Sequence, residues 1–231
     1  MQKTYALGDP HGNYKGMMQC LEAVNFDYDK DRLIILGDIC DGYPETKQCI
    51  DEALKIKDCI MILGNHDEWT LSWMNTGIKQ HWHVSQGGDN TIASYGSVDD
   101  VPDSHRKFLR TAYLYWEQER MLFVHGGVQL GKPMNDQNKD HLLWDRDLIC
   151  YAYKESKRDP LWKVNGYDWI YVGHTATWLI NKSNDPIIAG NMINLDTGAG
   201  SVGPMTIMDI HTQEYWQSDS GKELYGSWQG R

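Results

Sequence analysis

Side chains that bind metals or transfer protons recur along this chain in short segments that contain glycine. The segments read GDPHG (8–12), GDICDG (37–42), GNHD (64–67), HGG (125–127) and GH (173–174). The candidate residues that they supply are Asp9, His11, Asp38, Asn65, His66, His125 and His174. These are oxygen and nitrogen donors without a thiolate, a mixture that suits Mn, Fe or Zn better than a soft-metal or calcium site. Two such metals about 3.5–4 Å apart could share one carboxylate and stabilise the attacking and leaving oxygens of an in-line displacement.

Each of these residues also has a structural interpretation. A single aspartate after a strand is more often a turn or helix-cap residue than a metal ligand. Five strand ends that carry Asp, Asn or His beside Gly are more than turn preferences produce, so we favour a shared site. The other histidines have no such context. Of these, His81 and His83 flank Trp82 in a polar loop, and we expect both at the surface.

Short apolar runs precede the five motifs and predict the strands that position them. They cover residues 5–7, 33–36, 60–63, 121–124 and 169–172. Runs of this length fit strands that are buried on both faces. Asp9, Asp38 and Asn65 follow one another at intervals close to the roughly 30 residues of a βαβ unit. Because parallel strands end at the same edge of a sheet, we expect the motifs to meet at one rim.

The stretches between these runs predict the remaining elements. Apolar residues at helical spacing indicate helices over 14–24 and 44–57. The middle of the chain reads as two more helices around a Gly-Gly loop, and the last third as short strands that pair with antiparallel neighbours. The predicted ranges are 67–75 and 103–112 for the helices, 87–88 for the loop, and 187–188, 192–195, 205–209 and 214–216 for the strands.

Composition limits the class of protein and its partners. The 231 residues fit one domain over 1–231, with a loosely packed tail at 221–231. A net charge of −10 disfavours a duplex nucleic acid as partner. The five cysteines include no CxxC pair, no apolar run approaches about 18 residues, and no signal peptide is evident. We therefore expect a cytoplasmic protein with no membrane partner, and the oligomeric state is left open.

The five motifs, in this order, resemble the calcineurin-like metallophosphoesterases. Within that superfamily the chain resembles the phosphoprotein phosphatase branch, and is most similar to bacterial and phage members such as lambda protein phosphatase and to diadenosine tetraphosphatases. The resemblance covers roughly 4–210 and includes LWDR (143–146) and LDTGA (195–199). It implies an α/β fold, a four-layer α/β/β/α sandwich. It also implies two divalent metal ions, with manganese as the expected metal and iron or zinc as alternatives.

The resemblance also implies a role for each motif residue. Asp9 and His11 would bind one metal, Asp38 would bridge both, and the second metal would be completed by Asn65, His125 and His174. The nucleophile would be a metal-bridging hydroxide. His66 would be the general acid, oriented and kept protonated by Asp41. Arg146 would contact the phosphate of the substrate together with Asn65 and His66, although Arg146 could instead be a surface residue that pairs with Asp145 or Asp147.

One departure from the family pattern bears on the substrate. Phosphoprotein phosphatases usually carry Arg in a DRG segment, whereas this chain has Asp41-Gly42-Tyr43. We expect a phosphatase, specifically a phosphomonoesterase that acts on phosphoserine or phosphothreonine proteins. The alternative is a phosphodiesterase or pyrophosphohydrolase for a dinucleoside polyphosphate, a cyclic nucleotide or an RNA end. For that alternative, Trp69, Trp73 and Trp82 are the candidates for stacking on a base. A non-catalytic binding module is disfavoured, because no ligand is missing from the set.

Overall fold

Two five-stranded sheets pack face to face in the computed structural model, which describes residues 2–226 and 230. The first sheet has the order β10-β9-β1-β2-β3, with β1, β2 and β3 parallel and β9 and β10 antiparallel to their neighbours. Its strands are β1 (Thr4–Leu7), β2 (Arg32–Ile35), β3 (Asp58–Met61), β9 (Thr206–Asp209) and β10 (Tyr215–Gln217).

The second sheet has the order β4-β5-β6-β8-β7. Strands β5, β6 and β8 are parallel, and an antiparallel strand lies at each edge. Its strands are β4 (Tyr115–Gln118), β5 (Met121–Val124), β6 (Trp169–Val172), β7 (Ile187–Ala189) and β8 (Met192–Asn194).

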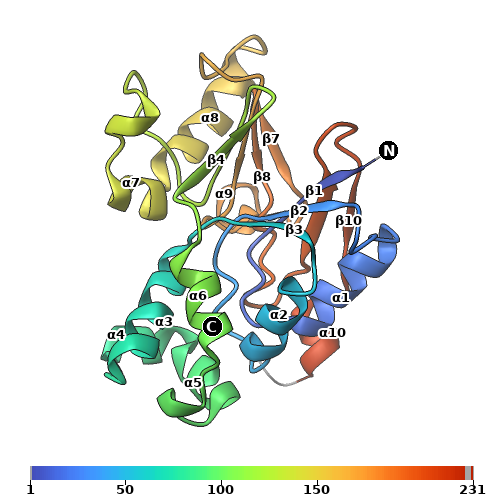
Figure 1. Ribbon diagram of the computed structural model, residues 1–231. Helices are drawn as coiled ribbons and strands as arrows, with labels where there is room; N and C mark the ends of the chain where they lie inside the picture. The colour runs from blue at the N-terminus through green and yellow to red at the C-terminus, as the bar shows by residue number, and fades with distance from the viewer. Residues whose placement is uncertain (1, 227–229, 231) are drawn as a thin grey trace.

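Helices cover the outer faces of both sheets and gather beside the first one (Figure 1). The longer helices are α1 (Tyr14–Ala23), α2 (Thr46–Ala53), α3 (Asn65–Thr76), α5 (Asp89–Tyr95), α6 (Asp103–Arg110) and α8 (Asp147–Arg158). The shorter ones are α4 (His81–His83), α7 (Lys139–Trp144), α9 (Thr177–Asn181) and α10 (Gly221–Tyr225), with a π-helix at Val84–Gly88 and 3₁₀ turns at Val98–Asp100 and Met134–Asp136.

Three apolar clusters define four layers. The middle cluster lies between the sheets, where the rings of Phe123 and Tyr171 stack with centroids 4.9 Å apart. A second cluster joins the first sheet to α1 and α2 through residues such as Met17 and Ile50. The third joins the other sheet to α8, for example through Ile149. Each sheet therefore has one face against the other sheet and one against helices, and the predicted α/β/β/α sandwich is confirmed.

The prediction of one common rim needs a correction. The apolar runs before GDPHG, GDICDG and GNHD are β1, β2 and β3 of the first sheet, whereas those before HGG and GH are β5 and β6 of the second. A strand of either sheet is covered on both faces, so its apolar pattern does not tell which sheet it joins. The motifs meet because the strand ends of two packed sheets lie next to each other.

Several helix boundaries also differ from those predicted. Helix α2 is shorter than 44–57, and the Gly-Gly loop is the end of the π-helix Val84–Gly88. Helix α3 begins at Asn65 instead of Asp67. Its start is stabilised by the Asp67 carboxylate, which accepts a hydrogen bond of 2.9 Å from the Gly64 amide. The earlier start places Asn65 and His66 in the first turn of this helix.

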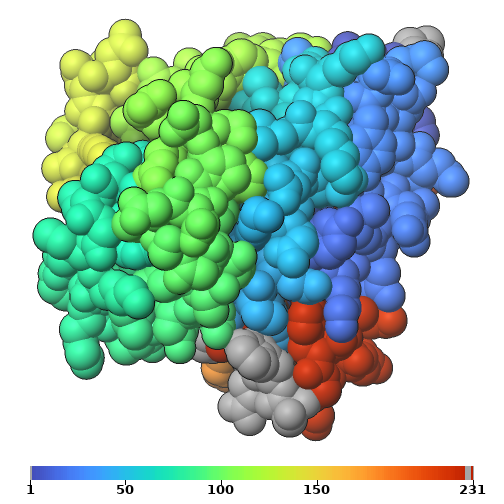
Figure 2. All heavy atoms as spheres, turned by 60° about the horizontal axis from the view of Figure 1, so that its bottom comes forward, coloured from blue at the N-terminus to red at the C-terminus, as the bar shows by residue number. Residues whose placement is uncertain are grey.

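The predicted loose tail contains an ordered helix. Helix α10 lies beside α1 (Figure 2), where Nζ of Lys15 donates to the carbonyl oxygen of Leu224 at 3.0 Å. The Tyr225 ring stacks on Tyr43 with centroids 4.4 Å apart. These contacts hold residues 221–226 against the domain, while residues 227–229 and 231 lie outside the described residues. Among the helices that the structure describes, none combines the length and apolarity needed to cross a bilayer.

A buried carboxylate on α2 gives the fold a predictable response to acid. Glu52 accepts hydrogen bonds from Oη of Tyr28 and Nζ of Lys55, both at 2.7 Å, and from Oη of Tyr14 at 3.3 Å. Burial alone would raise the pKa of Glu52, but these donors outweigh it and the pKa lies below its ordinary value. A lowered pKa means that the ionised form stabilises the folded state above the unfolded pKa of about 4.3, and that this contribution is lost as the pH falls.

Glu52→Gln is therefore expected to lower the free energy of unfolding by about 1–2 kcal/mol at pH 7, since hydrogen bonds to a charged group are lost. The difference from the wild type should shrink as the pH falls below about 4.3. Urea denaturation at pH 7, 5 and 4 measures it. Glu22→Gln on the exposed side of α1 removes the same charge and serves as the control. A deficit that is equal at all three pH values would contradict the assignment.

Candidate metal centre

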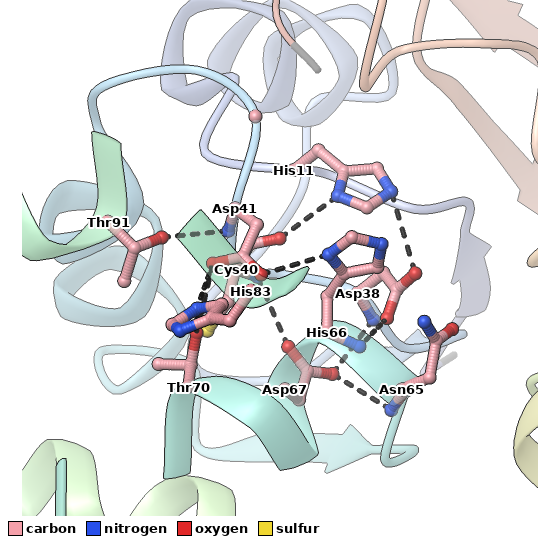
Figure 3. A network of polar contacts seen from close by, with 12 residues as sticks. His11, Asp38, Cys40, Asp41, Asn65, His66, Asp67, Thr70, His83 and Thr91 are labelled. Carbon is pink, nitrogen blue, oxygen red and sulfur yellow. Dashed lines mark hydrogen bonds and ion pairs between the residues drawn. The ribbon is translucent and has the colours of Figure 1, made fainter. Parts of the chain in front are cut away.

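The structure brings the seven candidate side chains together at the ends of five strands. His11 and Asp9 follow β1, Asp38 follows β2, and Asn65 and His66 begin α3 directly after β3. The two remaining imidazoles, His125 and His174, follow β5 and β6. None of the seven residues is more than 1% exposed. Part of this cluster is seen from close by in Figure 3.

Two groups of metal-capable atoms share one carboxylate. Asp9, His11 and Asp38 form one group, and Asp38, His125 and His174 form the other. Within each group the ligand atoms lie within 4.8 Å of one another. A carboxylate common to two adjacent groups is the arrangement that a pair of metal ions requires, with Asp38 between them.

The two carboxylates are each held by one oxygen and leave the other in the cluster. Oδ2 of Asp9 accepts from the His174 amide at 2.8 Å, and Oδ1 of Asp38 accepts from the His66 amide at 2.9 Å. Oδ1 of Asp9 and Oδ2 of Asp38 are buried and have no hydrogen-bond partner in residues 2–226 or 230. Burial, reinforced by the nearby Asp196, raises the pKa of Asp9 well above its ordinary value. Because a buried carboxylate oxygen that accepts no hydrogen bond is unfavourable, a cation bound beside Oδ1 of Asp9 would stabilise the folded protein.

Two imidazoles are oriented by the backbone so that Nε2 faces the cluster. Nδ1 of His11 donates to the Cys40 carbonyl at 2.9 Å, and Nδ1 of His125 donates to the Leu36 carbonyl at 2.7 Å. Their Nε2 atoms lie 3.6 and 3.3 Å from Oδ2 of Asp38. Such hydrogen bonds fix the tautomer that presents Nε2 to a metal ion.

The charges inside the cluster are those of a site that attracts cations. Burial alone would lower the pKa of His125, but the Asp38 carboxylate outweighs burial and raises it to about 9 in the metal-free protein. Conversely, burial would raise the pKa of Asp38, yet His125 and His66 hold it well below its ordinary value. Oδ1 of Asn65 lies 3.1 Å from Nε2 of His125 and so faces the same group. The donor set therefore fits two divalent cations.

His66 lies beside the cluster and is held by Asp41. Nδ1 of His66 donates to Oδ2 of Asp41 at 2.9 Å, and its ring meets the His11 ring edge-on with centroids 5.1 Å apart. Burial alone would raise the pKa of Asp41, but hydrogen bonds from His66 and His83 outweigh burial and lower it to about 2. Asp41 is thus a buried carboxylate that stays ionised and orients the His66 ring through this hydrogen bond.

Two tryptophans form an aromatic wall at the edge of the site. The Trp69 ring lies 4.9 Å from the His66 ring, and the Trp144 ring lies 5.2 Å from Trp69 and 5.8 Å from His174, all between centroids. Trp144 is 39% exposed, so part of this wall faces solvent. Of the three tryptophans predicted as candidates for stacking on a base, Trp69 lies at the site. Trp73 is buried in the core, and Trp82 is exposed on α4.

Comparison with known proteins identifies the family of this chain. The profile of the Calcineurin-like phosphoesterase family matches residues 3–177, more than half of the chain. The chain belongs to the calcineurin-like phosphoesterases. It is accordingly a metal-dependent phosphoester hydrolase, as its motifs predicted.

Two relatives in sequence carry the same enzyme name. The symmetrical bis(5'-nucleosyl)-tetraphosphatase of Pseudomonas fluorescens is 36% identical, and the match covers 91% of this chain and 92% of that protein. The enzyme of the same name from Nitrosomonas europaea is 30% identical over 54% of this chain, but the match covers only 44% of the relative. A solved structure proposed to be a diadenosine tetraphosphatase superposes on this chain with a TM-score of 0.69. The superposition covers 95% of this chain and 94% of the other chain at 15% sequence identity, so it establishes the fold alone.

The usual phosphate-binding arginine of the phosphoprotein phosphatase branch has no equivalent at position 42. Gly42 has φ +96°, and a Cβ atom there would lie 3.0 Å from the carbonyl oxygen of His11. The loop therefore favours glycine. Arg146, the other candidate, is exposed, and its Nη1 donates to the His174 carbonyl at 2.8 Å. It borders a cavity of about 270 Å³, which is also lined by Ser85, Gln86, His174, Ala176 and Leu179.

Sequence reasoning missed three residues at this site. Asp67, to which it gave no role, accepts hydrogen bonds from the amides of Asp38, Cys40 and Gly64 and so fixes the loop after β2. Its place in GNHD was the available signal. Trp144, within LWDR, was not weighed as a stacking residue. The prediction that His83 is a surface residue is wrong: it is buried, and its Nε2 lies 3.0 Å from Oδ1 of Asp41.

Proposed function

We propose that this calcineurin-like phosphoesterase is a phosphomonoesterase of the Ser/Thr protein phosphatase type. The observation that carries the proposal is the buried His66–Asp41 pair next to the metal cluster. An alkoxide such as that of serine is a poor leaving group and has to be protonated as the P–O bond breaks. A histidine held by an ionised carboxylate is suited to supply that proton.

Six residues would hold two divalent cations, for which we propose manganese. Asp9 and His11 would bind one, Asp38 both, and the ligands of the second would be Asn65, His125 and His174. When bound, the two cations lower the pKa of a water molecule and neutralise charge on the phosphoryl oxygens. The guanidinium of Arg146, which lies next to His174, would orient the phosphate from the cavity side together with Asn65 and His66.

The protein's own part in the reaction is to hold and transfer a proton. Because Nδ1 of His66 donates to Asp41, the proton for the leaving oxygen comes from Nε2 of His66. As that proton leaves, Asp41 keeps the neutral ring in place for reprotonation. Burial of both residues excludes water from this hydrogen bond and strengthens it.

The test compares kcat/KM for a phosphoserine peptide and for diadenosine tetraphosphate, each assayed with Mn²⁺ and after exhaustive chelation. We expect the peptide to be the better substrate and chelation to abolish its hydrolysis. Preference for the dinucleotide by more than an order of magnitude would contradict the phosphomonoesterase proposal. Full activity after chelation would contradict the metal-dependent mechanism itself.

A second candidate is a pyrophosphohydrolase for dinucleoside polyphosphates, and a specific observation favours it. Trp69 and Trp144 form an aromatic wall between His66 and His174, on which a nucleobase could stack. The relatives described above carry the name of such an enzyme. A nucleotide leaving group needs less help from an acid than an alkoxide does, so this candidate makes less use of the His66–Asp41 pair.

For this candidate, Trp144→Ala is expected to lower kcat/KM for diadenosine tetraphosphate by about 5- to 150-fold, because base stacking contributes about 1–3 kcal/mol. Hydrolysis of the phosphoserine peptide should change little. Trp178→Ala is the matched control, since Trp178 is similarly exposed and Nζ of Lys182 lies over its ring. Equal losses on both substrates would show that Trp144 supports His174 and does not bind a base.

A further inference from the structure

Asp41 is held by more groups than a pair with His66 requires. Its Oδ2 accepts from His66, while its Oδ1 accepts from Oγ1 of Thr70 at 3.0 Å and from Nε2 of His83 at 3.0 Å (Figure 3). Its amide donates to Oγ1 of Thr91 at 2.8 Å. Both carboxylate oxygens and the backbone are therefore fixed, and the carboxylate is fully buried.

His83 is itself fixed in place. It is 2% exposed, and the backbone of Gly88 closes its pocket so tightly that a Cβ atom there would lie 2.3 Å from Cδ2 of the imidazole. Oγ1 of Thr70 lies 3.3 Å from Nε2, on the side of Asp41. The ring has little room to turn, so its N–H remains directed at Oδ1 of Asp41.

We infer that His83 is a positioning residue for the protonation of the leaving group, an inference that rests on the role of His66 in the proposed function. Two donors on Oδ1 leave Oδ2 as the acceptor for Nδ1 of His66. Without His83, the hydroxyl of Thr70 alone holds Oδ1, and the carboxylate can rotate out of the plane in which His66 donates to it. A small misorientation of a reacting group is costly for catalysis.

Three variants and two substrates isolate this role. His83→Leu removes the donor at similar volume, His83→Gln retains an N–H at the reach of Nε2, and His81→Gln alters the exposed histidine two residues earlier as the matched control. Phenyl phosphate has a poor leaving group that depends on the acid, whereas 4-nitrophenyl phosphate has a good one that depends on it much less. Metal content and thermal unfolding are recorded for each variant.

We expect His83→Leu to lower kcat for phenyl phosphate by up to about 100-fold, the loss that a small misplacement of a reacting group can cause. The loss on 4-nitrophenyl phosphate should be several-fold smaller, and KM should not change. His83→Gln should restore most of the rate, and His81→Gln should behave as the wild type. Should His83→Leu not fold, His83→Asn, which shortens the reach of the donor, replaces it in the same comparison.

A second measurement does not depend on activity. In the metal-free protein, the His66 N–H that donates to Asp41 should give a downfield proton NMR signal, which His66→Asn identifies by its disappearance. We expect this signal in the wild type and in His83→Gln, and its loss or broadening in His83→Leu.

Each other outcome overturns the inference. Equal losses of kcat on both esters, or a raised KM alone, would mean that His83 only anchors the segment whose Ser85 and Gln86 line the cavity. An unchanged NMR signal and unchanged kinetics would mean that Thr70 suffices to hold Asp41. If the wild type hydrolyses neither ester, the proposed function fails, while the NMR comparison still decides whether His83 positions Asp41 and His66.

Discussion

Asp38→Asn is expected to abolish hydrolysis of 4-nitrophenyl phosphate and to prevent binding of the metal pair. Asp38 belongs to both groups of candidate ligands, and its Oδ2 lies 3.6 Å from Nε2 of His11 and 3.3 Å from Nε2 of His125. Asparagine can still accept the hydrogen bond from the His66 amide, so the loop after β2 keeps its anchor. What disappears is the negative charge that two cations would share, and the loss should exceed the roughly 100-fold seen for residues one step further from a metal.

Two measurements check this result. Metal content after dialysis against Mn²⁺ should fall from two ions per chain in the wild type to one or none. Thermal unfolding should show that Mn²⁺ stabilises the wild type, by about 2.7 kcal/mol at 100 times its dissociation constant, and no longer stabilises the variant. Asp58→Asn, which removes the same charge at the partly exposed ion pair with Arg32, is the control. Two ions bound to Asp38→Asn with full activity would refute the site.

His66→Asn is expected to lower kcat for phenyl phosphate by about 10²- to 10⁴-fold, the usual contribution of a positioned general acid. The asparagine amide can still donate to Oδ2 of Asp41, so the buried carboxylate keeps a partner. The loss on 4-nitrophenyl phosphate should be much smaller, because its leaving group departs without a proton. Metal content should not change, since His66 lies beside the cluster and is held by Asp41.

The role of His66 is decided by comparing the loss of kcat on phenyl phosphate with the loss on 4-nitrophenyl phosphate. Rates are measured under saturating substrate with equal metal loading, and the wild type and Asp38→Asn provide the two reference levels. If His66→Asn loses metal together with activity, His66 is a metal ligand and a different residue has to protonate the leaving oxygen. If both esters lose the same factor, the residue binds the phosphate and does not act as an acid.

The candidate ligands were predictable from the sequence because the signal is local. A run of three or four apolar residues that ends at Gly together with Asp, Asn or His is typical of a strand end, and no distant contact is needed to recognise it. The same locality explains why β1, β2, β3, β5 and β6 were found close to their observed bounds. The resemblance added the layered arrangement, which composition and spacing alone did not give.

Other features depended on packing between distant segments. Strands β5 and β6 are apolar and largely buried, as β1 and β2 of the first sheet are, so only the packed structure assigns them to a second sheet whose ends adjoin those of the first. His81 and His83 have nearly the same neighbours in sequence, but they lie two residues apart on α4 and so about 200° apart around the helix axis, which directs one to solvent and the other to Asp41. Long-range packing of this kind is not encoded in a residue's immediate neighbours. The sequence alone therefore determined which residues are candidate ligands, and only the tertiary structure showed which residues support them.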